Sequence, residues 1–151
     1  MNMRYLLNFL VVALLVVVSS SFKAKPPVKT YTISINITNI RNKKGKIQLQ
    51  LYRTQKAFKA EVPYKTFRIS KNDVTGKTLD FKITGLEPNH YGLALLDDEN
   101  GNKKMDYGLV YPKEGFGFSD YYHTAWSKPT FYKFKLYLNT DKSVTVKIRY
   151  M

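Results

Sequence analysis

The chain has 151 residues, no cysteine, and 25 Lys and Arg against 11 Asp and Glu, which gives a formal net charge of +14. A chain of this length forms one ordinary domain. The absence of cysteine excludes disulfides, thiolate metal sites and lipidation of an N-terminal cysteine. Hydrophobic residues make up 44% and aromatic residues 15%, which is too apolar for a disordered basic tail. We therefore expect a folded module without redox chemistry.

The N-terminus has the pattern of a secretory signal peptide. Arg4 precedes an apolar run over residues 5–18, and three serines at 19–21 follow the run. The alternative is an uncleaved membrane anchor, although the run is shorter than the about 20 apolar residues needed to span a bilayer. We predict a signal peptide over 1–21, a linker over 22–29 and a domain over 30–151 that is exported to the periplasm or the extracellular space. Membrane contact is expected only through the N-terminal segment, if it is not cleaved.

Beyond residue 30, apolar and polar residues alternate with a period of two, which is typical of half-buried strands. The alternation returns seven times: Tyr31 to Ile37, Ile47 to Leu51, Phe67 to Ile69, Leu79 to Ile83, Tyr91 to Leu95, Tyr132 to Leu138 and Val144 to Ile148. We interpret the first two runs as a hairpin with one solvent-exposed face, closed by a turn over 42–45. Residues 54–64 have mixed spacing and predict a short helical or irregular connection.

Seven short strands without an ordinary amphipathic helix between them predict an all-β fold. We expect an antiparallel β-sandwich, immunoglobulin-like or prealbumin-like, with one long ordered loop excursion. A closed barrel is the alternative. Many lysines lie in or beside the strands, where charge discourages edge pairing, so much of the basic charge has a structural explanation. We expect a monomer.

The alternation stops between residues 97 and 130, and so long an irregular stretch inside a compact domain is usually functional or disordered. Its aromatic content, including the only tryptophan, predicts an ordered excursion over one end of the sandwich. We expect this excursion to be the binding surface of the protein. The candidate contacts are Tyr107, Tyr111, Phe116, Phe118, Tyr121, Tyr122 and Trp126, with Lys103, Lys104 and Lys113 supplying charge.

Basic charge interleaved with aromatic residues predicts a surface for a glycan or another polyanion. Lysines attract sulfate, phosphate or carboxylate groups, and exposed aromatic faces stack on sugars or bases. The ligands to consider for an exported chain are envelope polysaccharide, lipid headgroups and extracellular nucleic acid, without sequence-specific recognition of the last. The alternative is a cationic surface without a ligand, with the aromatic residues in the core.

One part of the excursion resembles a calcium-binding loop. Oxygen ligands at Asp98, Asn100, Asn102 and Asp106 match positions 1, 3, 5 and 9 of such a loop. The glycine expected at position 6 is Lys103, and the bidentate acid is missing, so any calcium binding is expected to be weak. The alternative is a hairpin loop whose Asp and Asn side chains bond to their own backbone. No other cofactor is expected.

Catalytic patterns are sparse. His90 and His123 lack the paired spacing of a zinc site. His123 has Glu114 and Asp120 near it in sequence, so a hydrolase built on these three residues is an alternative. The sequence contains neither a phosphate loop followed by a helix nor a Gly-x-Ser-x-Gly nucleophile. We favour a protein that is not an enzyme.

Several segments resemble the bacterial proteins grouped as domain of unknown function 2141. They are Asn39 to Lys46, Leu51-Tyr52, Gly85 to Tyr91, Asp98 to Asp106, Pro112 to Ser119, and Pro129 with Phe131. The resemblance spans roughly residues 30–150, and the Pro-Lys-Glu-Gly-Phe-Gly-Phe-Ser run is its most specific part. The chain departs from the pattern at Lys103, where a glycine is common. The resemblance implies an exported β-sandwich and assigns no activity.

Overall fold

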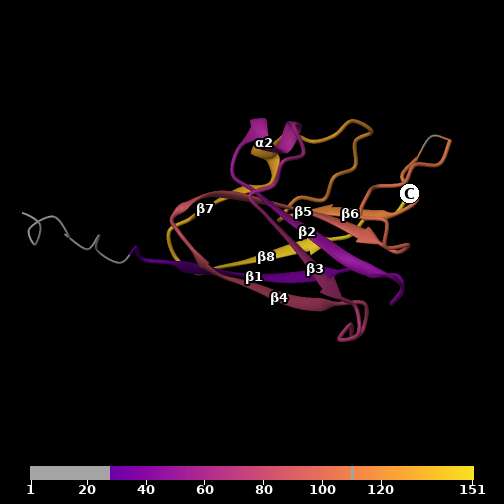
Figure 1. Ribbon diagram of the computed structural model, residues 1–151, viewed down its shortest axis with the longest axis horizontal. Coiled ribbons are helices and arrows are strands. Elements are labelled where there is room, and N and C mark those ends of the chain that lie inside the picture. Colours follow the sequence, from indigo (N-terminus) through magenta and orange to yellow (C-terminus); the bar gives the residue numbers. More distant parts are fainter. Residues whose placement is uncertain (1–27, 110) are drawn as a thin grey trace, which may run out of the picture.

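A computed structural model describes residues 28–109 and 111–151 and places them in two β-sheets (Figure 1). The expected signal peptide, residues 1–21, and most of the expected linker, residues 22–29, lie outside the described residues. Within the described part, no helix is long and apolar enough to cross a membrane. The fold is all-β apart from two short helical turns, as the sequence predicts.

The smaller sheet has three strands in the order β4-β1-β8. They are β1 (Tyr31–Thr38), β4 (Leu79–Leu86) and β8 (Lys142–Lys147). β1 pairs antiparallel with β4 and parallel with β8. The parallel pair corrects the expectation of a wholly antiparallel sandwich. The chain enters β8 from the other sheet, so no hairpin turn imposes an antiparallel direction on this pair.

The larger sheet has five strands, in the order β3-β2-β5-β6, and β7 also pairs with β5. They are β2 (Lys46–Tyr52), β3 (Lys65–Ser70), β5 (Asn89–Asp98), β6 (Gly115–Phe118) and β7 (Lys135–Leu138). β6 and β7 pair with successive halves of β5. The described residues therefore form eight strands in two sheets, where the sequence predicted seven, because β6 lies inside the expected excursion.

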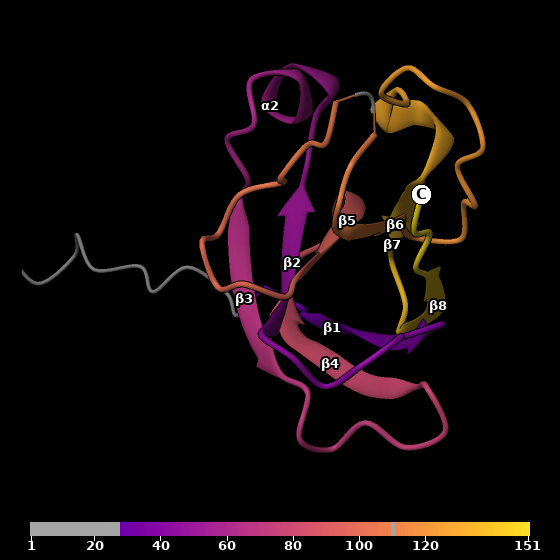
Figure 2. The ribbon, with the colours of Figure 1, turned by 90° about the vertical axis from the view of Figure 1, so that its right-hand side faces the viewer.

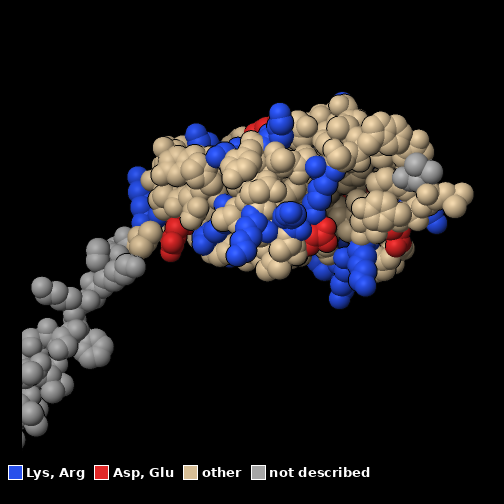
Figure 3. All heavy atoms as spheres, turned by 90° about the horizontal axis from the view of Figure 1, so that it is seen from above, with Lys and Arg blue, Asp and Glu red and all other residues tan. Residues whose placement is uncertain are grey.

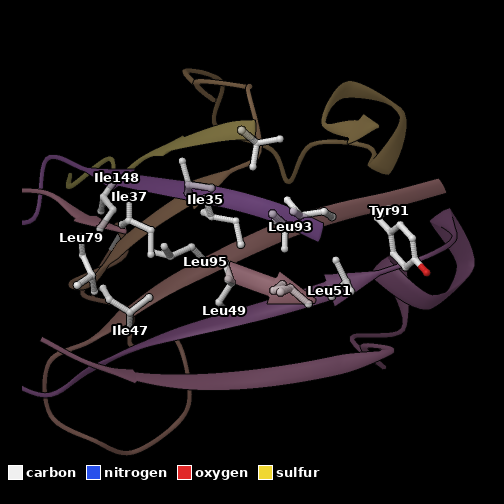
Figure 4. Packing of buried hydrophobic residues seen from close by; sticks show 14 of the residues in the cluster. Ile35, Ile37, Ile47, Leu49, Leu51, Leu79, Tyr91, Leu93, Leu95 and Ile148 are labelled. Carbon is white, nitrogen blue, oxygen red and sulfur yellow. The ribbon is translucent and has the colours of Figure 1, made fainter. Parts of the chain in front are cut away.

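The main core lies between the two sheets. Ile33, Ile35 and Ile37 of β1 are buried and face β2 and β5, which contribute Leu49 and Leu93 among others (Figure 4). The residues between them in β1 are only partly buried, so the period-two alternation correctly predicts which side of this strand is inside. Burial of these side chains is the main force that holds the sheets together.

The expected hairpin over residues 31–51 is wrong, because β1 and β2 lie in different sheets. The chain does turn there, and Gly45 has a φ of 66° in a place where any side chain would collide with the backbone of β5. The solvent-exposed face expected for β2 is also absent, since both sides of this strand are largely buried. Its outer side is covered by segments far away in the sequence.

A second, aromatic cluster covers the outer side of the five-stranded sheet. The connection over 54–64 contains the short helix α2 (Gln55–Lys59), the helical one of the two forms that the sequence predicts. Thr54 caps this helix, and α2 presents Phe58 to the sheet. The buried members are Tyr52, Phe58, Phe118, Phe131 and Phe134. Residues Phe131–Lys133 form the 3-10 helix η1, so the strand expected over 132–138 begins only at Lys135.

The excursion is ordered around β6, which joins the two sheets at one edge. Phe116 of β6 and Arg149, beyond β8, exchange backbone hydrogen bonds of 3.0 and 2.8 Å. On either side of β6 run two loops, over 99–114 and 119–130. Figure 2 shows these loops and α2 on the side of the five-stranded sheet that faces away from the three-stranded sheet.

Candidate functional site

A groove of about 720 Å³ lies on the outer side of the five-stranded sheet. Its floor comes from β2, β5 and β6, and its walls come from α2 and the two loops of the excursion. We call it the outer groove. Figure 3 views this side of the molecule and shows a hollow surface with Lys and Arg side chains beside it and few acidic ones.

The floor of the outer groove combines amide groups with apolar surface. Gln48 and Gln50 project from β2, beside Ala94 and Leu96 of β5. The Tyr52 hydroxyl donates a 2.9 Å hydrogen bond to the Gln50 carbonyl oxygen. Burial, with a smaller contribution from the charge of Glu61, raises the pKa of Tyr52 to about 12, so this hydroxyl stays protonated. The Gln48 amide is already engaged, because its Nε2 donates to Lys103 O and its Oε1 accepts from Arg68. The floor thus offers the amide nitrogen of Gln50 within an apolar surface.

Three aromatic side chains form the mouth of the outer groove. Residues 106–113 make a small hairpin, in which Gly108 N donates to Tyr111 O at 2.7 Å and Lys113 N donates to Asp106 O at 2.8 Å. Tyr107 and Tyr111 lie in this hairpin, and Trp126 lies in the other loop. Their exposed fractions are 68%, 43% and 76% respectively. The rings of Tyr111 and Trp126 are 5.1 Å apart and tilted by 37°, which makes an aromatic surface that water can reach.

The lysines of the outer groove differ in their partners. Lys128 forms a 2.7 Å salt bridge with Glu61 and lies 4.7 Å from the centre of the Phe58 ring. Lys103 and Lys104 are exposed, and within the described residues no carboxylate lies within 4.0 Å of their ammonium groups. The groove therefore has uncompensated positive charge along one wall.

His123 is largely buried, lines the groove and has structural partners. One ring nitrogen, Nε2, lies 2.7 Å from the Ser127 carbonyl oxygen, and Nδ1 lies 3.4 Å from the Tyr121 hydroxyl. The two acids of the alternative hydrolase site have other partners. Asp120 accepts a hydrogen bond from Thr145 N, and Glu114 accepts from backbone amides of the 98–106 loop. The arrangement needed for a hydrolase is not assembled by these side chains.

The 98–106 loop closes through its own hydrogen bonds. Asn100 Oδ1 accepts from Asn102 N, and Asn102 Oδ1 accepts from Lys104 N, both at 2.9 Å. The amide nitrogens of both asparagines donate to Asp106. These bonds are the ones expected for a hairpin loop whose side chains bond to their own backbone. Among the described residues, no group of three or more His, Cys, Asp or Glu side chains is placed to hold a metal ion.

Glu99 lies in this loop and Glu114 lies beside it, and their pKa values are shifted in opposite directions. Hydrogen bonds from Arg41 lower the pKa of Glu99, against a smaller opposing effect of burial. Burial raises the pKa of Glu114, and the nearby charges of Asp106 and Asp98 add to that rise, while backbone amides oppose it. The base of the excursion is therefore a region of dense, partly buried charge.

The structure brings together most, but not all, of the side chains expected to bind. Five of them line the outer groove: Tyr107, Tyr111, Phe116, Phe118 and Trp126. Lys103 and Lys104 line it too. Lys113 does not, and Tyr121 packs on the second aromatic cluster instead. Tyr122 also lies outside the lining, with Lys147 5.0 Å from its ring centre.

The floor residues Gln48, Gln50 and Tyr52 are missing from the sequence-based set. The sequence assigns them to a solvent-exposed face because the first two are polar. The sequence did contain a signal that this face is covered. Ala94 and Leu96 place small and apolar residues on the same outer face of the neighbouring strand β5. An apolar outer face on a central strand indicates that something covers it.

The fold and the groove define a class of protein: a single all-β domain of two sheets with an aromatic-rimmed groove on the larger sheet. A family model described as "Uncharacterized protein conserved in bacteria (DUF2141)" matches residues 35–147, more than half of the chain. The chain therefore belongs to this family, which confirms the resemblance seen in the sequence. Searches of curated proteins and of solved structures give no match.

Proposed function

We propose that the protein is a non-enzymatic binding module and that the outer groove holds a glycan chain. The observation that carries this proposal is the neighbouring pair of Tyr111 and Trp126, exposed at the mouth of a groove with a free amide on its floor. Neighbouring exposed aromatic rings beside a groove are typical of a binding surface. Sugar rings offer apolar faces that stack on aromatic rings and hydroxyl groups that bond to amides.

The other open face of the molecule lacks these features. The outer side of the three-stranded sheet has a hollow lined mainly by polar and charged side chains, such as Ser34, Asn36 and Thr145, together with Phe81. Neither tryptophan nor tyrosine lines it. This comparison supports the outer groove as the binding site and makes the three-stranded face a natural negative control.

The test is calorimetric titration with hexasaccharides of glucose, N-acetylglucosamine and galacturonic acid, paired with the fluorescence of Trp126, the only tryptophan. We expect saturable binding of at least one sugar, with a change in emission. Trp126→Ala abolishes it, and the control Tyr122→Ala, an exposed aromatic outside the groove, leaves it intact. Binding that survives Trp126→Ala, or no binding by any of the three, contradicts the proposal.

We further propose that the protein acts outside the cytoplasm. The signal-peptide pattern of residues 1–21 supports export. The mass of the protein recovered from the envelope or medium tests this: a mature chain beginning at Phe22 agrees, whereas an intact chain retained in the cytoplasm contradicts it.

For the fold type, we propose the prealbumin-like alternative. In immunoglobulin-like sandwiches the first, second, fourth and fifth strands share one sheet. Here the separation of β1 and β4 from β2 and β5 supports the other type. An experimental structure that places β1 beside β2 would overturn this assignment.

A further inference from the structure

We propose that the outer groove selects an acidic polysaccharide, with Lys103 and Lys104 binding carboxylate groups of its sugar rings. This inference rests on the proposed function of the groove and adds the chemical class of its ligand. It is carried by the charge of the groove wall and by the backbone conformation of Lys103.

The charge of the groove is not balanced by its own residues. Lys103, Lys104 and Lys128 line it, and Glu61 is the one acid among the lining residues. Since Glu61 is already paired with Lys128, the lining side chains carry a formal net charge of 3 − 1 = +2, which comes from the ammonium groups of Lys103 and Lys104. A groove that binds only neutral sugars gains nothing from two adjacent unpaired cations. An acidic sugar supplies the missing counter-charge.

Lys103 occupies a position that disfavours a side chain. Its φ is 68°, in the left-handed region that glycine adopts without strain. The conformation is fixed by two contacts of its backbone: Lys103 N donates to Asp98 Oδ2 at 3.1 Å, and Lys103 O accepts from Gln48 Nε2 at 3.4 Å. Asn39, Glu61, Lys77 and Asp120 also have a positive φ, and among these five residues Lys103 is the one cation that lines the groove. Here that side chain brings a positive charge to the groove wall.

The groove floor has a donor that suits the same ligand. The carbonyl oxygen of Gln50 already accepts from Tyr52, which orients the Gln50 amide. Within the described residues its amide nitrogen donates no hydrogen bond, so it is free for a carboxylate or hydroxyl group. A polysaccharide with uronic acids combines rings for Tyr111 and Trp126 with carboxylates for the lysines. A nucleic acid is less suited, because two phosphate contacts give only weak binding.

The test compares galacturonic acid hexasaccharide with its methyl ester, which keeps the same rings but removes the charge. We expect the acid to bind about tenfold more tightly than the ester at low salt, as two exposed charge contacts would give. The preference should shrink as salt is added. In the double variant Lys103→Gly and Lys104→Gln, acid binding should fall to the level of the ester, while ester binding stays unchanged.

Two controls separate this role from a structural one. Lys113→Gln removes a lysine of the same excursion that does not line the groove, and it should leave the preference for the acid intact. Lys103→Gly relieves the positive φ, so it should leave the melting temperature unchanged or raise it while binding falls. A structural role for Lys103 predicts loss of binding and of stability together.

The possible failures are distinguishable. Equal binding of acid and ester, both lost in Trp126→Ala, overturns the acidic class and leaves the glycan groove in place. Failure of acid and ester to bind, with binding of a glucose or N-acetylglucosamine hexasaccharide, also overturns only the acidic class. Failure of all the hexasaccharides, together with binding of the protein to anionic phospholipid vesicles through Lys103 and Lys104, overturns both proposals in favour of a membrane surface.

Discussion

Arg68 of β3 and Asp98, the last residue of β5, form a 2.9 Å salt bridge in which the carboxylate is completely buried. The same oxygen of Asp98 also accepts from Lys103 N. Asp98 is the residue that the sequence placed first in a calcium loop. In the structure Oδ2 already has a cation and a backbone donor of the protein, while Oδ1 is buried without a hydrogen-bond partner, so a metal ion at Asp98 would lie beside the positive charge of Arg68.

The first prediction concerns calcium. The melting temperature of residues 22–151 should be the same in EDTA and in millimolar calcium. Asp98→Ala should lower the free energy of unfolding by about 3 kcal/mol in both buffers, because it leaves Arg68 without its partner. A calcium-dependent rise in melting temperature that disappears in Asp106→Asn would contradict this account. It would mean that the loop rearranges to bind the ion.

A second prediction concerns the end of the chain. The Tyr150 hydroxyl donates a 2.6 Å hydrogen bond to Asp97, whose buried carboxylate also pairs with the buried Lys71. Burial, followed by the hydrogen bond to Asp97, raises the pKa of Tyr150 well above its usual range. Tyr150→Phe should therefore lower the free energy of unfolding by about 1–3 kcal/mol, measured by urea denaturation. Tyr137→Phe, on an exposed side chain, should have no measurable effect.

The third prediction concerns pH. Arg41 lowers the pKa of Glu99 below its ordinary value of 4.5, so the folded state favours the ionised carboxylate. The resulting stabilisation is present above pH 4.5 and is lost as the pH falls through the folded pKa. Glu99→Gln should cost about 1 kcal/mol at pH 7, and the deficit should shrink in acid.

The matched control for this titration is Glu87→Gln, an exposed acid outside the salt bridges of the described residues. Glu114 acts in the opposite direction, because its raised pKa contributes stability in acid that is lost as the pH rises through the folded value. Both Glu99 and Glu114 contribute to the pH profile of the wild-type protein. The difference between the wild type and Glu99→Gln isolates the contribution of Glu99. A deficit in Glu99→Gln that is constant between pH 7 and pH 3 would exclude the proposed ion pair.

The strands were predictable where inward positions carry large apolar side chains, as in β1 and β5. β6 was not predicted, because its inward residues are Gly115 and Gly117. A Cβ at Gly115 would lie 2.4 Å from Tyr150, and one at Gly117 would lie 2.8 Å from Val146. Only glycine lets this strand approach the end of the other sheet. The alternation of glycine and phenylalanine in β6 therefore places its large side chains on the outer side, and inward apolar side chains are missing from this strand.

The sheet assignment could not be read from alternation. Alternation shows which side of a strand is buried but says nothing about its neighbours. The parallel pairing of Ile35 with Val144 joins residues from opposite ends of the domain. Part of the groove could not be predicted for the same reason. Trp126 and Gln50 line the same groove only because the excursion folds back over the sheet. The aromatic rim was predictable from composition, whereas the floor was not.

The central claim is that a glycan occupies the outer groove. The most direct test is NMR mapping of backbone and side-chain amides during titration with galacturonic acid hexasaccharide. We predict the largest shifts at the Trp126 indole and the side-chain amide of Gln50, and none at Ser34 and Asn36 on the three-stranded sheet. Shifts confined to the three-stranded sheet, or scattered over surface lysines, would contradict the account.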